Sequence, residues 1–594
     1  MKNLVGFTIH WNLSEKSRKI LHSAQNRALL YFKHLETKNL TVGETHIDIW
    51  GHRGMESRVH TLPDGSLAIL VGSPHTEVDW EDARNKLLAD HFEIPWDGRV
   101  VLLRISKDGK KWTMWNDWLG SIPVFHAEIG QGRVLSTLEP VIVEAAGYTP
   151  DDFFLPGLVS LLINGHYLSD WTLYKRMKTV LPDSVAEWDE KGFRIKQLWT
   201  VQPSRSRLEA DWNDLVDEMH AVSHKAVADI LKTRPKWILP LSSGLDSRLI
   251  AGVAADIGAN VDTYAWGGRN TTDVVYSHHI AKTLGLPWKH VDLPNNFLSK
   301  YTPLWADWFG SSMHFHGMYQ MCFLDAIASE PTTPVICGFM GDVLAGAAIK
   351  ERYNVHASGR SFHVNSYWAC HWTASELQSC AKFPLKDALE ANADEFKRQL
   401  DARDGAFYQR VQFLSLWNRQ RFFTNFQSTL SDYWCGVANP FMNREYARFC
   451  LSIPRTALDD RKLLCDVYRR YYGSLAVIPG TYAQDPYILT GKYLVMRRIA
   501  NLLPAAFYRG PLKGFGNAEL RMDIHSIQAT GKEALWPIFD VWDHLREWID
   551  VDRLNTEYQA VMNSAEDIRP LRKLQSIQTL AYRLLNHKDT TDHP

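Results

Sequence analysis

The stretch Trp237–Gly252, W-I-L-P-L-S-S-G-L-D-S-R-L-I-A-G, decides how the second half of the chain folds. An apolar run leads into a corner of small residues, and a second apolar run follows. This order is typical of a buried strand that turns sharply into a helix. The corner also gathers polar side chains in a short space, namely Ser242, Ser243, Asp246 and Ser247 around Gly244.

The same stretch begins an alternation of strands and helices. Residues 260–267 predict a second strand, residues 273–286 a helix, and residues 288–293 a third strand. A helix is also expected upstream, over Leu208–Leu231, because its apolar residues share one face. Such an alternation is the mark of a parallel sheet covered on both faces. After about Gly346 the chain is mostly helical and rich in aromatic residues.

The N-terminal part of the chain has a different character. Residues 99–137 hold short β-prone runs separated by glycine-containing turns, and residues 183–199 add a second set. The stretch 200–213, T-V-Q-P-S-R-S-R-L-E-A-D-W-N, then breaks the pattern with proline, serine and charge. We therefore predict two domains, 1–205 and 206–594.

Composition limits the classes of partner. The formal net charge of -1 gives no electrostatic reason to expect nucleic acid or an anionic membrane. No long apolar run predicts a membrane span, and the N-terminus lacks a secretory apolar region. The seven cysteines are scattered, begin at Cys322 and form no C-x-x-C pair. That usage indicates a reduced, cytoplasmic enzyme without a zinc site.

The corner has a chemical interpretation. A helix N-terminus presents free N–H groups and a positive partial charge, which suit a phosphate. Gly244 allows close approach, and Asp246 makes sense if it holds a Mg²⁺ that the phosphates share. The competing interpretation is a tight turn made of small residues, and the corner alone does not decide between the two. No Walker-type loop or G-x-S-x-G elbow is present.

The residues carry a resemblance to a known family. "PLSSGLDSRLIA" resembles the pyrophosphate-binding loop S-G-G-x-D-S of the ATP pyrophosphatase superfamily, and specifically of asparagine synthetase-like amide synthetases, with Ser243 where glycine is usual. Later segments are similar in the same order. They place Asp273 at a helix start, Asp342 as a second metal-binding acid, Asn443 where aspartate is usual, and Lys513 in a late loop.

The upstream half also resembles this family. Residues 115–140 and 172–189 are similar to hairpins of its glutaminase-type domain. The resemblance implies an α/β chain of two domains. The first would be a glutaminase-like (Ntn-type) αββα sandwich, and the second a parallel-sheet α/β PP-loop synthetase domain with a helical extension.

Two departures from the family change the expected chemistry. Glutamine-using members have a nucleophilic cysteine at the mature N-terminus, whereas this chain begins Met1-Lys2-Asn3 and has no cysteine before Cys322. We expect an inactive glutaminase-like domain. Phe339 and Val343 stand where asparagine synthetases have glutamates, which predicts a bulkier or less polar acyl substrate.

The resemblance implies a two-step ligation that uses ATP and Mg²⁺. A carboxylate would attack the α-phosphorus to give an acyl-adenylate, and an amine would then displace AMP. Lys513 would stabilise the developing charge. The residues expected to contact ATP are Leu239, Ser242, Ser243, Gly244, Asp246, Ser247, Trp266, Gly267 and Gly338, and those expected to hold the metal are Asp246 and Asp342.

The base for the amine is an open question in the sequence. His314 and His316 fall in the family's substrate loop and titrate in a suitable range; ordinary hydrogen-bonded histidines are the alternative. Lys513 has the alternative of a solvated loop lysine. Nearby aromatic residues predict either an apolar substrate cleft or plain core: Trp305, Trp308, Phe309 and Phe315.

Three functions follow from these features. The first is an amide synthetase that joins a small-molecule or peptide carboxylate to an amine. The second is an intramolecular cyclase that closes a β-lactam or a lasso-peptide macrolactam. The third is a catalytically silent nucleotide-binding scaffold. A homodimer is compatible with each of them, and an RNA-thiolating role is disfavoured by the neutral charge and the lack of paired cysteines.

Overall fold

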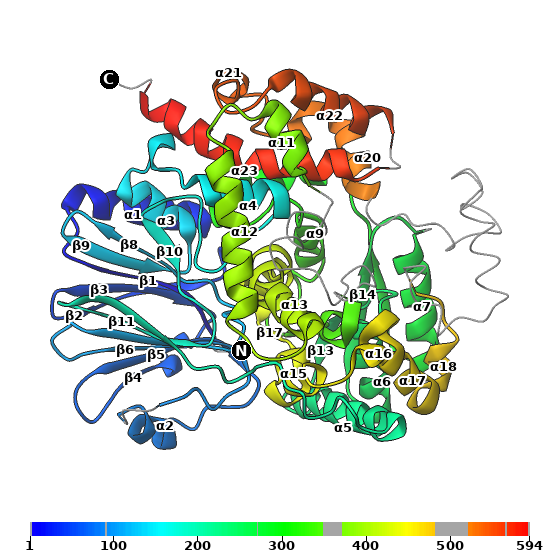
Figure 1. The fold of residues 1–594 in the computed structure, drawn as a ribbon. Coiled ribbons are helices and arrows are strands. Elements are labelled where there is room, and N and C mark those ends of the chain that lie inside the picture. The colour runs from blue at the N-terminus through cyan, green and yellow to red at the C-terminus, as the bar shows by residue number, and fades with distance from the viewer. Residues whose placement is uncertain are drawn as a thin grey trace.

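The computed structural model describes residues 3–88, 92–269, 271–347, 371–480, 521–564 and 567–591. The fold is mixed α/β, with two antiparallel sheets in the N-terminal part and a parallel sheet later (Figure 1). Across the described ranges, no helix has the length and apolar character needed to cross a membrane.

Two six-stranded antiparallel sheets lie face to face in the N-terminal part. Their orders are β10-β8-β9-β1-β3-β2 and β12-β11-β7-β6-β5-β4. Phe7 and Ile9 both point into the core between the sheets because alternate side chains on a strand share a face. The strands are β1 (Leu4–Trp11), β2 (Glu36–Val42), β3 (Thr45–Gly51), β4 (Val59–Thr61), β5 (Leu67–Pro74), β6 (Gly98–Ile105), β7 (Trp112–Asn116), β8 (Phe125–Ile129), β9 (Gly132–Ser136), β10 (Met177–Thr179), β11 (Ser184–Asp189) and β12 (Gly192–Gln197).

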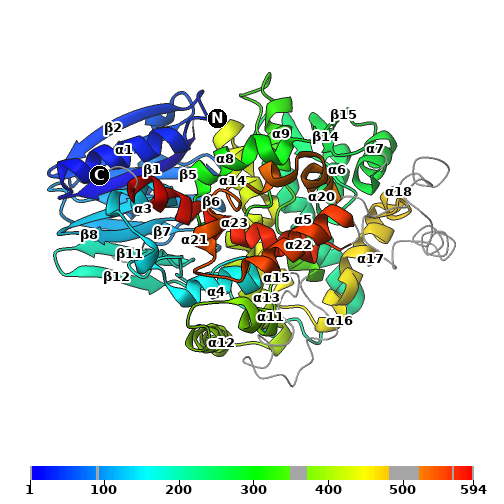
Figure 2. The same cartoon turned by 90° about the horizontal axis from the view of Figure 1, so that it is seen from above.

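Helices accompany these sheets. Ser14 caps the first helix by accepting the Ser17 N–H at 3.1 Å. That helix packs against α3, and Figure 2 shows it lying over β1 and β2. Residues 198–211 then form no helix or strand, and the domain boundary after residue 205 stays a prediction. The helices are α1 (Glu15–Ala28), α2 (Trp80–Lys86), α3 (Glu139–Ala146) and α4 (Leu155–Asn164).

The predicted parallel sheet is confirmed, with the strand order β15-β14-β13-β16-β17. All four pairings are parallel, so the chain leaves the first strand, β13, in one direction and later returns to its other side at β16. The two-residue strands β16 and β17 were not expected, because such short runs carry no pattern. The strands are β13 (Trp237–Pro240), β14 (Val261–Trp266), β15 (Trp288–Val291), β16 (Val335–Ile336) and β17 (Val437–Ala438).

Helices pack on this sheet in two groups. α6 and α7 pack together beside β13 and β14, while α9 and α14 pack together beside β15, β16 and β17. Right-handed crossovers place the two groups on opposite faces. The expected upstream helix begins four residues late, at Trp212, because Asp211 caps it. These helices are α5 (Trp212–Leu231), α6 (Leu245–Asp256), α7 (Thr272–Leu284), α8 (Phe297–Phe309), α9 (Tyr319–Ala326) and α14 (Phe426–Cys435).

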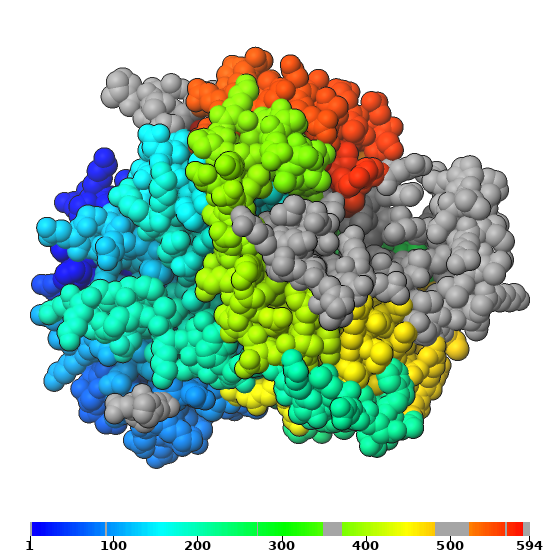
Figure 3. Space-filling model, viewed as in Figure 1, coloured from blue at the N-terminus to red at the C-terminus, as the bar shows by residue number. Residues whose placement is uncertain are grey.

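The remaining described chain is helical, as expected. The last helix, α23, packs on α4, and a buried ion pair joins its Arg583 to Glu139 of α3. Figure 3 shows α12 as a yellow-green band between the antiparallel sheets and the rest. The helices are η3 (Val343–Ala347), α11 (Ala374–Cys380), α12 (Lys386–Asp401), α13 (Phe407–Ser415), the π-helix η4 (Leu416–Thr424), α15 (Arg444–Cys450), α16 (Arg455–Leu458), α17 (Lys462–Tyr471), α18 (Gly473–Ala476), α20 (Arg521–Thr530), α21 (Trp542–Leu545), α22 (Val551–Asn563) and α23 (Arg569–Thr591), with 3₁₀ turns η1 (Met55–Arg58), η2 (Pro150–Asp152), η5 (Pro440–Met442), η6 (Asp459–Arg461) and η8 (Gly531–Leu535).

Candidate active site

A cavity of about 380 Å³ lies beyond the ends of β13 and β16. These two strands flank the point where the strand order reverses, and ligands of open parallel sheets bind in the crevice outside such a point. We call this cavity the corner cavity. Of the residues predicted to contact ATP or metal, it is lined by Ser242, Gly244, Asp246, Ser247, Trp266, Gly338 and Asp342, and not by Leu239, Ser243 or Gly267.

Serine hydroxyls fix the shape of the corner. The Ser242 N–H donates to Ser247 Oγ at 3.1 Å, and the Gly244 N–H donates to Ser242 Oγ at 3.1 Å. Gly244 precedes α6 without a side-chain cap, so the first N–H groups of this helix are available to a ligand. The corner therefore presents a pre-shaped helix N-terminus to the cavity.

The hydrogen bonds of Ser243 account for a serine at a position where the family usually has glycine. Its backbone N–H and its hydroxyl both donate to Asp273 Oδ1, at 2.9 and 2.5 Å. Asp273 lies in the first turn of α7, so these bonds tie the corner to the next helix of the sheet. A hydroxyl at this position is therefore used for structure, pointing to Asp273 and not into the cavity.

Two carboxylates meet in the cavity. Burial, followed by the nearby charge of Asp342, raises the pKa of Asp246 well above its ordinary value, while Arg461 acts in the opposite direction. The Oδ1 atom of Asp246 is buried without a hydrogen-bond partner among the described residues. Such a pair requires a cation or a proton between its members. The arrangement fits the need of Mg²⁺ for oxygen ligands.

Glycines allow the second aspartate to approach the first. A Cβ on Gly341 would lie 2.9 Å from Asp246 Cγ and 2.8 Å from the Phe441 ring, and one on Gly338 would lie 3.0 Å from Asp246 Cβ. Between them, Met340 has a φ of 80°, which is uncommon for a residue other than glycine. The segment after β16 therefore depends on small residues to bring Asp342 to α6.

The structure does not bring the predicted histidine bases to the corner cavity. His314 and His316 are buried in an aromatic cluster, where the His316 ring stacks on Phe423 at 3.8 Å. Burial lowers the pKa of both well below the ordinary value. Neither residue lines the described part of the cavity, so a role for them as bases stays a prediction.

The other sequence predictions have mixed outcomes. Lys513 lies outside the described residues. The four aromatic residues considered for a substrate cleft are core: Trp305, Trp308, Phe309 and Phe315 are all buried, and none lines the cavity.

Asn443, where the family has aspartate, also has a structural role. Its Oδ1 accepts the Tyr446 N–H at 3.0 Å and caps α15, and its Nδ2 donates to Asp97 at 2.9 Å. By contrast, Phe339 and Val343 do line the corner cavity, as their place beside Asp342 predicts. The cavity is apolar where asparagine synthetases carry glutamates.

Arg248 anchors the corner from behind. This buried residue of α6 donates to four backbone carbonyl oxygens, those of Ser243 (2.7 Å), Leu475 (3.0 Å), Ile478 (2.7 Å) and Pro479 (2.9 Å). One guanidinium thus joins the loop that leads into α6 to residues 475–479. The sequence showed this arginine beside the corner but not the partners that it holds.

Several cavity residues escaped the sequence analysis. They come from the π-helix η4, from α9, from α14 and from the turn before α17. No local pattern marks them, because the residues lie far from the corner in sequence and reach it only through packing. They are Tyr319, Arg419, Gln420, Thr424, Gln427 and Arg461.

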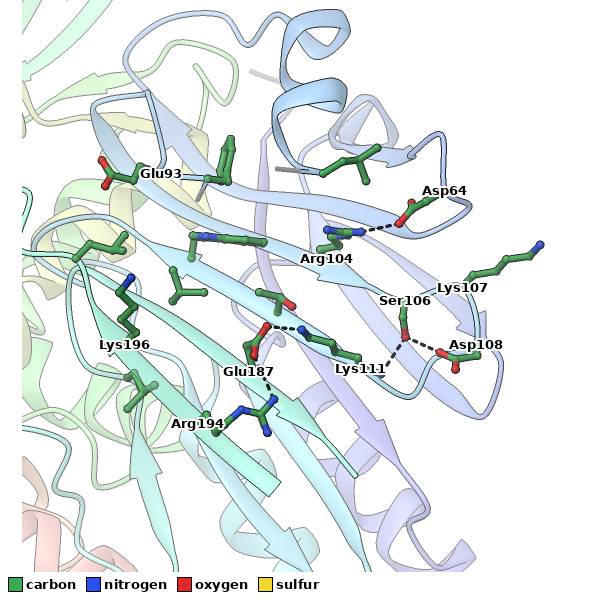
Figure 4. Close-up of a pocket in the computed structure, with 17 residues that line it drawn as sticks. Asp64, Glu93, Arg104, Ser106, Lys107, Asp108, Lys111, Glu187, Arg194 and Lys196 are labelled. Carbon is green, nitrogen blue, oxygen red and sulfur yellow. Dashed lines mark hydrogen bonds and ion pairs between the residues drawn. The ribbon is translucent and has the colours of Figure 1, made fainter. Parts of the chain in front are cut away.

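A larger hollow of about 1210 Å³ lies on the outer face of the sheet that contains β6, β7 and β11. We call it the sheet hollow. Figure 4 shows ion pairs among some of its charges: Arg104 reaches Asp64 at 2.5 Å, and Lys111 and Arg194 converge on Glu187, whereas Glu93, Lys107 and Lys196 are drawn without such a contact. Size alone would select this hollow, but the ion pairs of Arg104, Lys111 and Arg194 already occupy part of its polar lining.

The parallel sheet with a polar cavity at its switch point defines an α/β protein that binds its ligand at the carboxyl edge of the strands. Residues 218–524, just over half of the chain, match the family described as asparagine synthase. The chain therefore belongs to the asparagine synthase family of ATP-dependent carbon–nitrogen ligases, which confirms the resemblance seen in the sequence.

Other comparisons add little. No curated protein gives a significant match to the chain. Among solved structures, the chain is similar to the glutamine phosphoribosylpyrophosphate amidotransferase from B. subtilis complexed with ADP and GMP, at 11% identity over 48% of this chain and 65% of that one. A structure of the allosteric regulatory enzyme of purine biosynthesis matches at 12% identity over 48% and 64%. This chain thus spans slightly less than two thirds of each, and the TM-score of 0.23 in both cases is too low to support a common fold.

Proposed function

We propose that this protein uses ATP to adenylate a substrate carboxylate and then transfers the acyl group to an amine, releasing pyrophosphate and AMP. The observation that carries the proposal is the meeting of Asp246 and Asp342 in a cavity at the switch point, beside the uncapped N-terminus of α6. A helix N-terminus stabilises phosphate, and a carboxylate pair suits the magnesium that accompanies it.

Different residues of the cavity would bind the metal and orient the phosphates in the first step. Asp246 and Asp342 would hold Mg²⁺, which would neutralise charge on the phosphates. The N–H groups at the start of α6 would orient the polyphosphate. The substrate carboxylate then attacks the α-phosphorus. The bond to the bridging oxygen breaks, and its electron pair leaves with pyrophosphate.

The second step forms the amide. The amine attacks the acyl carbon, the bond from that carbon to the AMP oxygen breaks, and the amine gives up a proton. No histidine lines the described part of the cavity, so the cavity lining gives no support to His314 or His316 as the proton acceptor. Lys513 remains our candidate for stabilising the developing charge.

We further propose that residues 1–205 form an Ntn-type, glutaminase-like αββα domain that does not supply ammonia, and residues 206–594 the synthetase domain. The facing antiparallel sheets support the first part of this proposal. The absence of cysteine from residues 3–321 supports the claim that this first domain does not supply ammonia, since the glutamine-using members need a cysteine nucleophile. The amine would then come directly from the second substrate.

Isotope exchange between ATP and pyrophosphate in the presence of candidate carboxylates tests the proposal. We expect exchange without glutamine, and a fall of about 100-fold or more in Asp246→Asn. Asp256→Asn, at the exposed end of the same helix, is the matched control and should leave exchange unchanged.

Four outcomes would change the conclusion. Exchange that survives Asp246→Asn would contradict the assignment of the site. ATP binding without exchange for any carboxylate would favour the scaffold. A product that is the cyclised form of a single substrate would identify the cyclase, and glutamine-dependent synthesis would contradict the proposed role of residues 1–205.

A further inference from the structure

Residues 416–427, which comprise η4 and the start of α14, contact two parts of the molecule, and we call them the cavity wall. On one side, the wall lines the corner cavity with side chains that include Gln420, Thr424 and Gln427. On the other side, it donates hydrogen bonds to and accepts them from residues that precede 182 in the sequence. The side chains that do so are Trp417, Asn418, Arg421 and Asn425.

A short loop after β7 receives three of these side chains, and we call this loop, residues 117–121, the support loop. Each of the three bonds ends on a backbone carbonyl oxygen, and the first two measure 3.0 and 3.2 Å. The contact therefore depends on the path of the loop backbone. The pairs, with the donor first, are Trp417 with Trp118, Arg421 with Gly120, and Asn425 with Ser121.

A buried carboxylate holds the support loop in its shape. Asp117 Oδ1 accepts the N–H groups of Leu119 and Ser121, at 3.0 and 3.1 Å, and its Oδ2 accepts the Ser121 hydroxyl at 2.7 Å. Gly120 has a φ of 59°, in the left-handed region that favours glycine. These residues belong to the stretch 115–140 that resembles a hairpin of the glutaminase-type domain, and the loop uses them for its conformation.

Arg421 makes the most extensive contact between the wall and the N-terminal part. Its side chain is fully buried and donates to the carbonyl oxygens of Gly120, Ser169 and Val180, which belong to three separate segments. Burial lowers the pKa of Arg421 to about 9. A cation is costly to bury unless its donors are bonded. The three carbonyl groups therefore fix this guanidinium, and with it the middle of η4.

A second arginine holds the part of the wall that leads into α14. Arg99 of β6 is buried and donates to Asn425 Oδ1 at 2.5 Å and to Thr429 Oγ at 3.0 Å. Its Nε lies 3.7 Å from Asp432 Oδ2, further along the same helix. The N-terminal part thus holds both η4 and α14, whereas Arg248 anchors the phosphate corner to residues 475–479.

We propose that the N-terminal part takes part in the ligation by positioning the cavity wall, with Arg421 as the positioning residue and the support loop as its partner. This inference rests on the proposed function, because it takes the corner cavity as the site of the reaction. It gives residues 1–205 a role that needs no cysteine nucleophile. Because the phosphate corner has its own anchor, a displaced wall should affect the carboxylate substrate more than ATP.

Kinetics of the exchange between ATP and pyrophosphate test the proposal, with the carboxylate that supports exchange in the parent protein. Arg421→Met should raise the KM for this carboxylate about tenfold, since small displacements of a binding surface are costly. The KM for ATP should stay unchanged. Arg421→Lys should restore part of the loss, because an ammonium group keeps donors for the carbonyl groups.

Asp117→Asn disturbs the same contact from the side of the loop, because an amide nitrogen cannot accept the bonds that a carboxylate oxygen accepts. It should raise the KM for the carboxylate in the same way. Combined with Arg421→Met, it should add less than its separate effect, since both changes act through one contact.

Hydrogen–deuterium exchange of the full-length protein follows the wall without any substrate. Peptides from residues 416–427 should take up deuterium faster in Arg421→Met, while peptides from α6 keep the uptake of the parent protein. Arg133→Met is the matched control, because Arg133 also donates to backbone carbonyl groups, those of Lys110 and Asp189, but within the antiparallel sheets. It should change neither the KM for the carboxylate nor the uptake of the wall.

Two results would overturn the inference. One is an Arg421→Met variant with the carboxylate KM and the wall uptake of the parent protein. The other is an equal rise in the KM for ATP and for the carboxylate, which would indicate general loosening of the fold. If Arg421→Met does not fold, Arg421→Lys and Asp117→Asn supply the same comparison. A parent protein without exchange contradicts the proposed function, whereas deuterium uptake still decides whether Arg421 positions the wall.

Discussion

The corner cavity and the sheet hollow differ in whether their polar side chains already have hydrogen-bond or ion-pair partners. In the hollow, acids and bases bind one another across neighbouring strands. In the corner cavity, which is less than half the volume, Asp246 Oδ1 and Gln420 Nε2 are buried without partners among the described residues. Buried polar groups without partners are therefore better evidence for a ligand-binding site than the volume of a surface depression.

The largest effect should come from closing the space between the aspartates. In Gly341→Ala, the new Cβ would meet Asp246 Cγ at 2.9 Å, closer than real Cβ atoms approach. A displacement of about 1 Å can cost about 100-fold in rate, so exchange of ATP with pyrophosphate should fall by that order. Gly473→Ala, which would meet nothing within 4 Å, is the control. Unchanged exchange in Gly341→Ala would mean that the aspartates need not touch.

A large loss of stability should follow from removing the anchor of the corner. Arg248→Met would remove the guanidinium from four backbone carbonyl groups, of which that of Leu475 also accepts the Ile478 N–H. We expect the free energy of unfolding to fall by about 3 kcal/mol, measured by urea denaturation. A loss below about 0.5 kcal/mol would show that water replaces the guanidinium and that the corner is not held from behind.

A smaller effect is expected at Ser243. Ser243→Ala removes a hydroxyl that donates to a buried carboxylate, that of Asp273, and should cost about 1.5 kcal/mol. Ser299→Ala, whose hydroxyl bonds to a carbonyl near the surface, should cost less than about 0.5 kcal/mol. Equal losses in the two variants would contradict the view that Ser243 serves as a tie between the corner and α7.

The smallest effect belongs to the sheet hollow. Arg194 and Glu187 are exposed enough for solvent to screen their pair, with side chains 45% and 29% accessible. Arg194→Met and Glu187→Gln should each leave both the midpoint of urea denaturation and the exchange rate unchanged. Impaired exchange in either variant would contradict the view that the sheet hollow has no role in the reaction.

Local sequence was sufficient for three strands of the parallel sheet, β13, β14 and β15, and for the corner after β13. The apolar run before Ser242 and the helix after Asp246 are both continuous in sequence, so their pattern predicts β13 and α6 directly. β17 is two residues long and forms only because β16 pairs with it, which no local pattern reveals.

The site was predictable only in the half that the corner supplies. Asp342 was found through family resemblance, but Arg419 and Gln420 reach the cavity through a π-helix, which has no sequence signature of its own. The prediction of His314 and His316 used the ordinary titration range of histidine, whereas burial lowers the pKa of both well below that range. Side-chain chemistry can be read from sequence, whereas burial depends on the assembled fold.

The π-helix also has a consequence for how this enzyme can diverge. A π turn differs from an α turn by one residue, so deleting one residue within Leu416–Thr424 would let the helix return to ordinary geometry. The side chain of Arg419 would then rotate out of register with Thr424, while β13, α6 and the aspartate pair stayed as they are. A single codon deletion could therefore change which side chains of η4 line the corner cavity, while Asp246 and Asp342 stayed in place.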